Sequence, residues 1–323
     1  MKHHVQPFEK PIILVHGGAG SFGRRNFKEY RSCLKDAVTN GYEALLSGSA
    51  IEGVVEAVKI MEDCGHMNAG IGSVLNLHGY VEMDAGIMDG KTMRAAGVAL
   101  IRKIRNPILL AKAIMDHTDH VLLAGDFAEK LGEKLGLETY DFVPQEDKKR
   151  KYNELYSKLL KGDIKHLRRI SELVQKYKDI AYGTVGAVAL DREGRLAAAT
   201  STGGYWLKLP GRIGDTPIVG AGFYANKNAA ASSTGIGEYI LIAGLCRKAV
   251  EFVEAGLNAT SAAVKSIEYM SAFFGENTAG LIIVDFRGYV GAAFNTKGMG
   301  RAILSKSHKE PVIAKPRING TVI

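Results

Sequence analysis

Hydrophobic residues recur along the chain in two spacings, and the first of these predicts helices. Apolar side chains fall at steps of three and four over residues 27–45 and again over residues 51–61, so both segments are expected to be amphipathic helices. A further helix is predicted after Asn106-Pro107, where a capping residue precedes a proline, and another from Gly125-Asp126. The first half of the chain is therefore expected to supply several helices with one buried face.

Short apolar runs predict the strands. They are expected at residues 11–16, 79–83, 95–101, 184–190, 195–200, 218–223, 229–233, 281–285 and 289–295. Four of the runs pair up as two hairpins, around Asp191-Arg192-Glu193-Gly194 and around Arg287-Gly288, and two more helices are expected from about Gly237 and Asn258. Because strands and helices do not alternate regularly in the second half, the pattern favours an α+β fold with mostly antiparallel sheets covered by helices.

Composition and charge narrow the class of protein. The chain has 323 residues, of which 46% are hydrophobic and 24% charged, so it can bury a large core. Its net charge is +8, and almost all of the excess lies between Lys148 and Lys178. We interpret this run as a solvated, partly helical linker over about residues 145–183, and no aromatic or motif signal beside it indicates a nucleic-acid partner.

The three cysteines, Cys33, Cys64 and Cys246, are widely spaced and do not form the pattern of a disulfide framework or a zinc site. The residues after Met1 include no apolar core typical of a signal peptide, and no stretch has the apolar length of a membrane span. These features predict a cytoplasmic protein without membrane association.

Two glycine-containing motifs suggest nucleotide binding. Residues 18–23 fit G-x-G-x-x-G between a predicted strand and a predicted helix, but the acidic residue and the further βα units of a dinucleotide-binding fold are missing. We therefore interpret residues 17–20 as a tight glycine turn, and keep a nucleotide-binding oxidoreductase as an alternative. Residues 85–92 resemble a phosphate loop but lack its first glycine, so they are expected to form a turn. The nine histidines show no paired-ligand spacing, and no catalytic metal is expected.

The chemistry is predicted at Gly183-Thr184, where the basic segment ends and a strand begins. Glycine permits unusual backbone geometry before a scissile bond, and a β-branched threonine holds its hydroxyl in few rotamers. Attack of that hydroxyl on the preceding carbonyl, followed by hydrolysis, would free the amine of Thr184. Such an amine has a pKa of about 8, which suits a base near neutral pH, so one residue would supply both nucleophile and base.

Three neighbouring segments strengthen this prediction. Thr202 closes the hairpin that begins at Thr184, so the two threonines are expected on adjacent strands. Arg212 and Asp215 lie in one Gly/Pro-rich loop and offer the charges that an amino acid's zwitterionic head requires. Thr234 with Gly235 joins a strand to a helix, where a hydroxyl and a backbone N–H can form an oxyanion hole.

Together, the motifs resemble the plant-type L-asparaginase/isoaspartyl peptidase family of N-terminal nucleophile (Ntn) hydrolases. The resemblance runs nearly end to end, through LVHGGAG, NAGIGS, MDAGIMDG, RNPILLA, GTVGAVAL, AAATSTGG, LPGRIGDTP, GAGFYAN, STGIGE and FNTKGM. It implies a four-layer αββα sandwich formed as one domain from residues 1–323. It also implies self-cleavage between Gly183 and Thr184 into chains 1–183 and 184–323, and pairing of two such protomers into a homodimer.

The resemblance also assigns roles to residues. Thr184 would be the nucleophile, Thr202 would position it, and Thr234 and Gly235 would form the oxyanion hole. Arg212 would hold the substrate α-carboxylate, Asp215 and the Gly237 carbonyl would hold the α-ammonium, and Asn68 would line the site. A structural sodium ion is implied at backbone oxygens of a loop, through Met61, Glu62, Cys64, Met67, Ala69 and Ile71. No catalytic cofactor is implied.

The implied reaction is hydrolysis of the side-chain amide of L-asparagine or of β-aspartyl peptide bonds, through a β-aspartyl acyl-enzyme. The chain departs from the family pattern where Leu207 replaces an asparagine before Lys208, where Ile236 replaces a small polar residue, and where Phe223 stands in place of a frequent cysteine. The departures at Leu207 and Ile236 keep a non-catalytic relative as an alternative, and the nearest rival activity is that of a glycosylasparaginase-like hydrolase on the same fold.

Overall fold

The computed structural model describes residues 6–20, 27–144, 146–160 and 183–314. Within these ranges the strands are β1 (Ile12–Ala19), β2 (Met83–Asp89), β3 (Ala95–Ile101), β4 (Leu122–Ala124), β5 (Val185–Leu190), β6 (Leu196–Thr202), β7 (Phe223–Ala225), β8 (Ala229–Gly235), β9 (Ala279–Asp285), β10 (Val290–Phe294), β11 (Met299–Ser305) and β12 (Val312–Ala314). The α-helices are α1 (Phe27–Ser47), α2 (Ala50–Asp63), α3 (Pro107–His117), α4 (Gly125–Lys134), α5 (Glu146–Leu160), α7 (Gly237–Ala243), α8 (Leu245–Glu254) and α9 (Ala259–Phe274).

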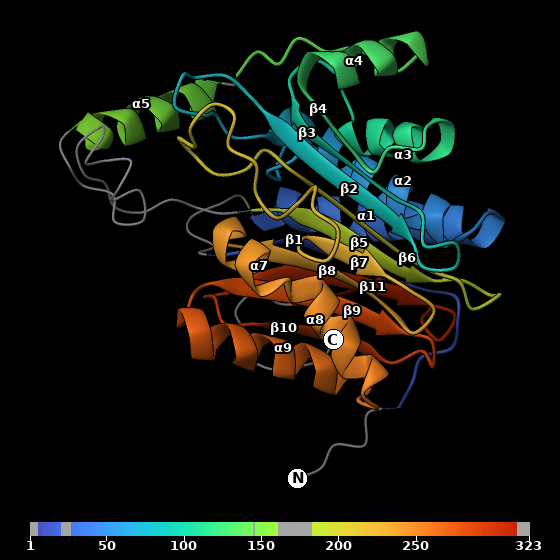
Figure 1. The fold of residues 1–323 in the computed structure, drawn as a ribbon. Helices are drawn as coiled ribbons and strands as arrows, with labels where there is room; N and C mark the ends of the chain where they lie inside the picture. The colour runs from blue at the N-terminus through green and yellow to red at the C-terminus, as the bar shows by residue number, and fades with distance from the viewer. Residues whose placement is uncertain (1–5, 21–26, 145, 161–182, 315–323) are drawn as a thin grey trace.

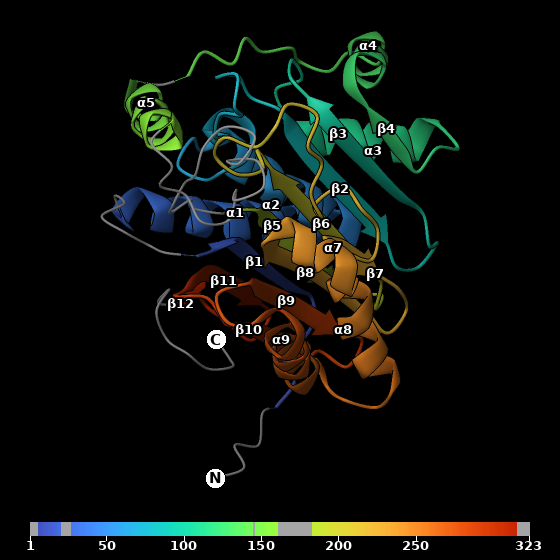
Figure 2. The same ribbon diagram turned by 60° about the vertical axis from the view of Figure 1, so that its left-hand side comes forward.

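Two sheets form the centre of the fold. The larger has the strand order β12-β11-β1-β5-β6-β2-β3-β4, and the smaller has the order β10-β9-β8-β7. All neighbouring strands pair antiparallel except β3 and β4. Figures 1 and 2 show the sheets stacked, with α1 and α2 outside the larger one and α8 and α9 outside the smaller one. The prediction of an α+β, αββα sandwich is confirmed.

Alternate residues of the central strands enter two separate cores. In β1, Ile13 and Val15 pack toward α1 and α2, whereas Ile12 and Leu14 pack between the sheets. The central strands of the larger sheet are therefore buried on both faces, which explains why runs such as residues 11–16 are continuously apolar rather than alternating. This double burial leaves the ends of the strands, rather than their faces, as places where polar groups gather.

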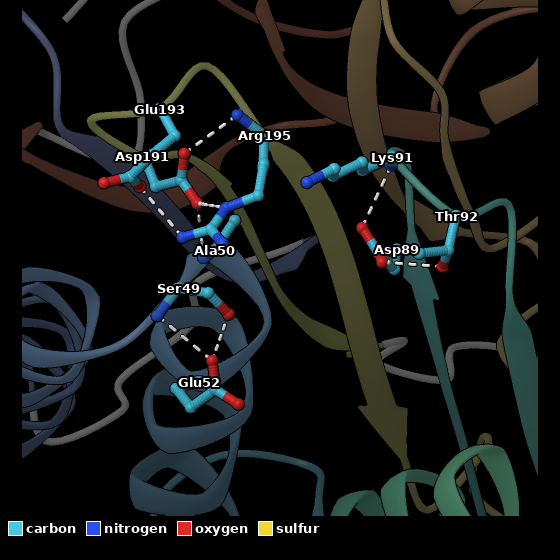
Figure 3. A network of polar contacts seen from close by, with 9 residues as sticks. All are labelled: Ser49, Ala50, Glu52, Asp89, Lys91, Thr92, Asp191, Glu193 and Arg195. Atoms are coloured by element: carbon cyan, nitrogen blue, oxygen red, sulfur yellow. Dashed lines mark hydrogen bonds and ion pairs between the residues drawn. The ribbon is translucent and has the colours of Figure 1, made fainter.

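The predicted helices α1 and α2 form an antiparallel pair on the larger sheet. A turn of the second half of the chain caps this pair: Asp191, between β5 and β6, accepts a hydrogen bond from Ala50 N at 3.2 Å at the start of α2 and pairs with Arg195 (Figure 3). In the same view, Ser49 N donates to the Glu52 carboxylate at 3.0 Å. A carboxylate at a helix N-terminus satisfies unpaired backbone N–H groups and the helix dipole. The contact therefore ties segments from either side of Gly183 to one another.

Three predictions for the first half were wrong in position. The strand predicted at 11–16 continues to Ala19, so Gly17 and Gly18 belong to β1 and not to a tight turn. The strand predicted at 79–83 is instead β2, Met83–Asp89, and the expected turn at 85–92 is largely this strand. Both segments contain glycines, which we interpreted as turn signals. In the sheet, neighbouring atoms leave no room for a side chain at these positions. A Cβ on Gly86, for example, would collide with the Phe223 ring.

The second half also differs in detail from the prediction. The strand expected at 218–223 is only Phe223–Ala225, because residues 218–222 form turns whose backbone bonds close locally. The helix expected from Gly237 breaks at Gly244, which has a φ of +57°, and continues as α8. The short β4 and the last two strands, β11 and β12, were not predicted. The hairpin of β9 and β10 was predicted correctly.

The basic segment is helical in its first part. Helix α5 covers residues 146–160, and its Leu155 and Leu159 are almost fully buried, so this part packs on the domain rather than being wholly solvated as expected. The predicted linker residues 161–182 lie outside the described residues. None of the helices in the described ranges combines the length and apolar character that crossing a membrane requires.

Candidate active site

The ends of three strands meet at the predicted cleavage position. Val185 pairs with Ser201 in the β5–β6 ladder, and this register puts Thr184 and Thr202 at the same edge of the larger sheet. The end of β8, in the smaller sheet, lies against this edge. There Thr234 Oγ1 accepts a hydrogen bond from Thr184 N at 3.3 Å. The fold thus brings together three threonines that lie far apart in the sequence.

Two side-chain donors converge on the carbonyl oxygen of Gly183. Asn68 Nδ2 lies 2.6 Å from it and Thr202 Oγ1 lies 3.0 Å from it. Asn68 is itself held on both sides, because Nδ2 also donates to Gly204 O at 2.6 Å and Oδ1 accepts from Val74 N at 2.9 Å. Donors aimed at a carbonyl oxygen increase its electrophilic character and stabilise the oxyanion that forms when a nucleophile attacks.

The backbone of β1 passes directly against this peptide bond. Gly18 has a φ of +108°, and a Cβ there would lie 3.1 Å from the Gly183 Cα. Both the left-handed conformation and the close approach require glycine. The glycine at position 18, near the end of β1, therefore permits the close contact with Gly183 and Thr184. In addition, β1 pairs antiparallel with both neighbours, unlike the parallel first strand of a dinucleotide-binding fold.

Thr234 has the hydrogen bonds expected of a hydroxyl that must donate elsewhere. Its Oγ1 accepts from Ala19 N at 3.2 Å as well as from Thr184 N. A hydroxyl carries two acceptor positions and one hydrogen. With both acceptor positions used by backbone N–H groups, the hydrogen of Thr234 is the part left to bind an incoming oxygen atom.

A second group of residues contains opposite charges in a buried loop. A Cβ on Gly237 would lie 2.5 Å from Arg212 Nη2 and 2.8 Å from Asp215 Oδ1, so this glycine leaves room for both side chains. Ser233 Oγ, from the residue before Thr234, donates to Asp215 Oδ2 at 3.3 Å. The charged pair is therefore joined through β8 to the threonine group.

Burial strongly affects Asp215. Loss of hydration raises the pKa of this carboxyl to about 6, against the opposing effect of the Arg212 charge and of the Ser233 hydrogen bond. At neutral pH the group is still mostly ionised. It is thus a poorly hydrated anion, and a cationic ligand group would relieve its desolvation.

Arg212 is held in place by two further side chains. Its Nε and Nη2 each donate to one oxygen of Glu238 at 3.0 Å, and its guanidinium lies 4.5 Å from the centre of the Tyr205 ring. The fork-shaped pairing lowers the pKa of Glu238, although burial acts in the other direction. A planar guanidinium fixed in this way is suited to bidentate binding of a second carboxylate.

The loop that carries Arg212 is anchored despite the substitution at Leu207. Leu207 N donates to Leu75 O at 2.9 Å, and Lys208 O accepts from Leu77 N at the same distance. The Leu207 side chain is fully buried with a φ of +61°, so apolar packing replaces what an asparagine would offer. Lys208 is also buried and donates to Glu82 O at 2.8 Å.

A buried histidine lies next to the site and was not predicted. His16 Nε2 is 3.0 Å from Ser232 Oγ, and the ring also interacts with the backbone of Thr184. Complete burial lowers the pKa of His16 to about 3, so the ring is neutral at ordinary pH. Its signal in the sequence was its place in the LVHGGAG motif, but only the stacking of the sheets shows which residues it contacts.

The loop implied as a sodium site curls on itself. Its glycines are pressed against carbonyls, because a Cβ on Gly70 would collide with Glu62 O and one on Gly72 would collide with Met67 O. A different cation already approaches the loop, since Lys148 Nζ donates to Ile71 O at 3.4 Å and to Ser73 O at 3.2 Å. Lys148 therefore places a positive charge at Ile71 O, one of the backbone oxygens that the resemblance implies as a sodium ligand. In the described ranges, no group of three or more His, Cys, Asp or Glu side chains is arranged to hold a metal ion.

The predicted site residues therefore form two connected groups. The first contains Asn68, Gly183, Thr184, Thr202 and Thr234, and the second contains Arg212, Asp215 and Gly237. Gly235 ends β8 beside the first group, with a φ of +149° and a Cβ position that Thr278 O would block. Glu238 and Ser233 were missed as partners, although both stand in a motif that was recognised.

Comparison with known proteins agrees with this arrangement. The family model described as asparaginase matches residues 9–313. A plant-type L-asparaginase of Pyrococcus furiosus is 46% identical over 301 residues, which cover 93% of this chain and 98% of the relative. An isoaspartyl peptidase/L-asparaginase of Xenopus laevis is 42% identical over 295 residues, which cover 91% and 92%.

The fold and the site define a hydrolase of the αββα sandwich class. The chain belongs to the asparaginase family. The prediction of an amidohydrolase of the asparaginase and isoaspartyl peptidase type is confirmed by this membership. The self-cleavage, the roles of individual residues and the sodium site remain predictions.

Proposed function

We propose that this protein is an autoprocessing N-terminal threonine amidohydrolase that acts on L-asparagine and on β-aspartyl peptides. The observation that carries the proposal is the pair of donors on the Gly183 carbonyl, Asn68 Nδ2 at 2.6 Å and Thr202 Oγ1 at 3.0 Å. Nothing in ordinary strand pairing requires two side chains to polarise one backbone carbonyl immediately before a threonine. Such polarisation is useful where that carbonyl is to be attacked.

In the first stage, the Thr184 hydroxyl attacks the carbonyl carbon of Gly183. Asn68 and Thr202 stabilise the developing oxyanion, and the peptide bond is converted to an ester. Water then hydrolyses the ester, which leaves Thr184 with a free α-amine at the start of the second chain. Thr234 Oγ1, at 3.3 Å from Thr184 N, is positioned to hold that amine.

In the second stage, the same hydroxyl attacks the side-chain carbonyl of the substrate. The α-amine accepts the hydroxyl proton and passes it to the leaving amine, while Thr234 and the Gly235 N–H stabilise the oxyanion. The product released first is ammonia from asparagine, or an amino acid or peptide from a β-aspartyl peptide. Water then hydrolyses the β-aspartyl ester.

The second group of residues recognises the head of the substrate. Arg212 binds the α-carboxylate, and Asp215 with the Gly237 carbonyl binds the α-ammonium. The buried, poorly hydrated state of Asp215 supports this role, because a substrate cation would compensate its charge. Small-molecule and dipeptide substrates share this head group, so both fit the same site.

Three further properties are part of the proposal. The loop from Met61 to Ile71 would hold a sodium ion through backbone oxygens, with a structural and not a catalytic role. Two cleaved protomers would pair as a homodimer, and the protein would act in the cytoplasm.

The experiment is intact-mass measurement of purified protein during a timed incubation, with Thr184→Ala as the inactive variant and Thr184→Ser as the matched control that keeps a hydroxyl. Fragments of 183 and 140 (323 − 183) residues are expected from the wild type and, more slowly, from Thr184→Ser, but not from Thr184→Ala. The cleaved protein should then hydrolyse asparagine and β-Asp-Leu. A folded chain that stays whole and still hydrolyses these substrates would contradict the threonine mechanism.

A further inference from the structure

Two of the three cysteines lie toward one end of the closely packed helices α1 and α2. A Cβ on Gly41 would be 2.7 Å from the Ala57 Cβ, and a Cβ on Gly53 would be 3.0 Å from the Leu45 Cβ. These two contacts fix the register of the antiparallel helices, since each step back along α1 corresponds to one step forward along α2. Continued in the same register, the pair brings the residue after α2, Cys64, opposite the turn of α1 that contains Cys33.

The side chains meet as this register requires. The thiols of Cys33 and Cys64 are close enough to interact electrostatically. Cys64 Sγ also lies 3.4 Å from Met61 O, which keeps the thiol over the end of α2. Cys33 is only 4% exposed, whereas Cys64 is partly accessible. A reagent in solution would therefore meet the Cys64 thiol before the Cys33 thiol.

We propose that Cys33 and Cys64 form an intramolecular disulfide when the protein meets a low-molecular-weight disulfide such as glutathione disulfide. The Cys64 thiolate attacks the external disulfide and releases one thiolate, which leaves a mixed disulfide on Cys64. The Cys33 thiolate then attacks the Cys64 sulfur and releases the second. Two protein S–H bonds and one external S–S bond are replaced by one protein S–S bond and two external thiols, so the two electrons lost by the cysteines reduce the oxidant.

The bond would join α1 to the segment that leads to the active site. Cys64 is four positions before Asn68, whose amide group holds both Gly183 O and Gly204 O. Fixing the start of this segment to α1 restricts the unfolded chain and the local opening of the loop, so the oxidised protein is expected to unfold at a higher temperature. Both cysteines precede Gly183, so the bond stays within one polypeptide whether or not the chain is cut there.

Cys246 provides an internal reference. It lies on α8 outside the smaller sheet and is completely buried. It is remote in the fold from the α1–α2 pair, so it should remain a free thiol while the other two react.

The experiment exposes the reduced full-length protein to glutathione disulfide under native conditions, then alkylates the remaining thiols after denaturation and measures the mass. Before alkylation, the wild type is expected to be about 2 Da lighter than the reduced protein, with one cross-link mapped to Cys33 and Cys64 and reversed by dithiothreitol. Cys33→Ser, a nearly isosteric control, should instead end as a stable glutathione adduct on Cys64, about 305 Da heavier. Cys64→Ser should not react, and only the wild type should gain melting temperature on oxidation.

Two outcomes would overturn the proposal. In one, the wild type keeps three alkylatable thiols after prolonged exposure. In the other, it accumulates the same stable adduct as Cys33→Ser, which would mean that the inner thiol cannot reach the outer one. Circular dichroism of both serine variants checks that they fold, and Cys33→Ala replaces Cys33→Ser if the latter does not.

Discussion

Arg212 and Glu238 form a fork-shaped ion pair in which Nε and Nη2 each lie 3.0 Å from one carboxylate oxygen. The pair is mostly shielded from water on the arginine side, where 14% of the side chain is exposed. In the proposed role of Arg212, a substrate carboxylate would therefore have to join or displace the Glu238 carboxylate that is already bound. Glu238 keeps the guanidinium plane oriented until that happens, which reduces the ordering required when substrate binds.

Arg212→Lys is expected to raise KM for asparagine by roughly tenfold or more, because an ammonium cannot replace two parallel hydrogen bonds, each worth about 1.5–3 kcal/mol when charge-assisted. The turnover number should change much less, since Arg212 does not touch the reacting carbonyl. Steady-state kinetics measure both constants. Arg247→Lys on α8, where Nε pairs with Glu251 at 3.1 Å, is the matched control. Equal KM values in the two variants would exclude Arg212 as the carboxylate clamp.

Thr202→Val is expected to slow self-cleavage about a hundredfold, which is typical for the loss of one oxyanion donor. The substitution removes the hydroxyl 3.0 Å from Gly183 O and keeps the shape of the side chain. The half-life of the intact chain measures the effect. Thr200→Val, two positions earlier on β6, serves as the control because its hydroxyl donates to Thr216 O instead. A rate in Thr202→Val as fast as in this control would show that the hydroxyl plays no part in cleavage.

Asp215→Asn is expected to stabilise the protein and weaken substrate binding. Burial raises the Asp215 pKa from its ordinary value of 3.8 to about 6, so the folded state holds this proton more tightly than the unfolded chain. The contribution of the group to the free energy of unfolding therefore falls as the pH rises from about 4 to about 6, by up to about 3 kcal/mol. Asparagine at position 215 removes that loss.

Urea unfolding of both proteins at pH 4.5 and pH 7 measures this effect. The advantage of Asp215→Asn over the wild type should be small at pH 4.5 and larger at pH 7, while KM for asparagine rises because the ammonium loses its counter-charge. In the wild type, KM should also rise as the pH falls through about 6, where Asp215 becomes protonated. An advantage that shrinks between pH 4.5 and pH 7 would contradict the assignment of the raised pKa.

Gly86→Ala is expected to destabilise the sandwich by about 1–3 kcal/mol, because its methyl group would press on the Phe223 ring between the sheets. Phe223→Leu makes room at the cost of a smaller buried side chain. The double variant should therefore be more stable than the sum of the two single losses implies, and urea unfolding of all four proteins gives the coupling. Simple additivity would show that the two positions do not compete for the same space. The Phe223 ring fits between the sheets because residue 86 has no side chain.

The sequence predicted helices and hairpins better than it predicted single strands. The steps of three and four in α1 and α2 survive because each helix buries only one face, and the β9–β10 hairpin is marked by its turn. The strand β2 was misplaced because it is buried on both faces and contains Gly86 and two aspartates, so neither alternation nor composition marks it. Its strand character depends on pairing with β3, the next strand along the chain, and with β6, which is distant in sequence.

The candidate site shows a similar division. Motif order was enough to name Thr184, Arg212 and Thr234. It did not reveal that Asn68 holds the oxygen of Gly183, or that Glu238 occupies Arg212, because these contacts join residues 115 and 26 positions apart. Charged and hydroxyl residues can be identified from the sequence, but their hydrogen-bond partners depend on how the sheets stack in the fold.

The strand order of the larger sheet has a consequence for assembly. Strands from before and after Gly183 interleave: β1 lies between β11 and β5, and β6 lies between β5 and β2. The proposed cut at Gly183 would leave the two pieces held by ladders that neither piece completes alone. Refolding after denaturation would then require two polypeptides to associate, so its rate would depend on protein concentration. The uncut chain would fold at a rate that is independent of concentration. Cleavage would thus leave the native state intact, but its recovery after unfolding would require the two pieces to find each other.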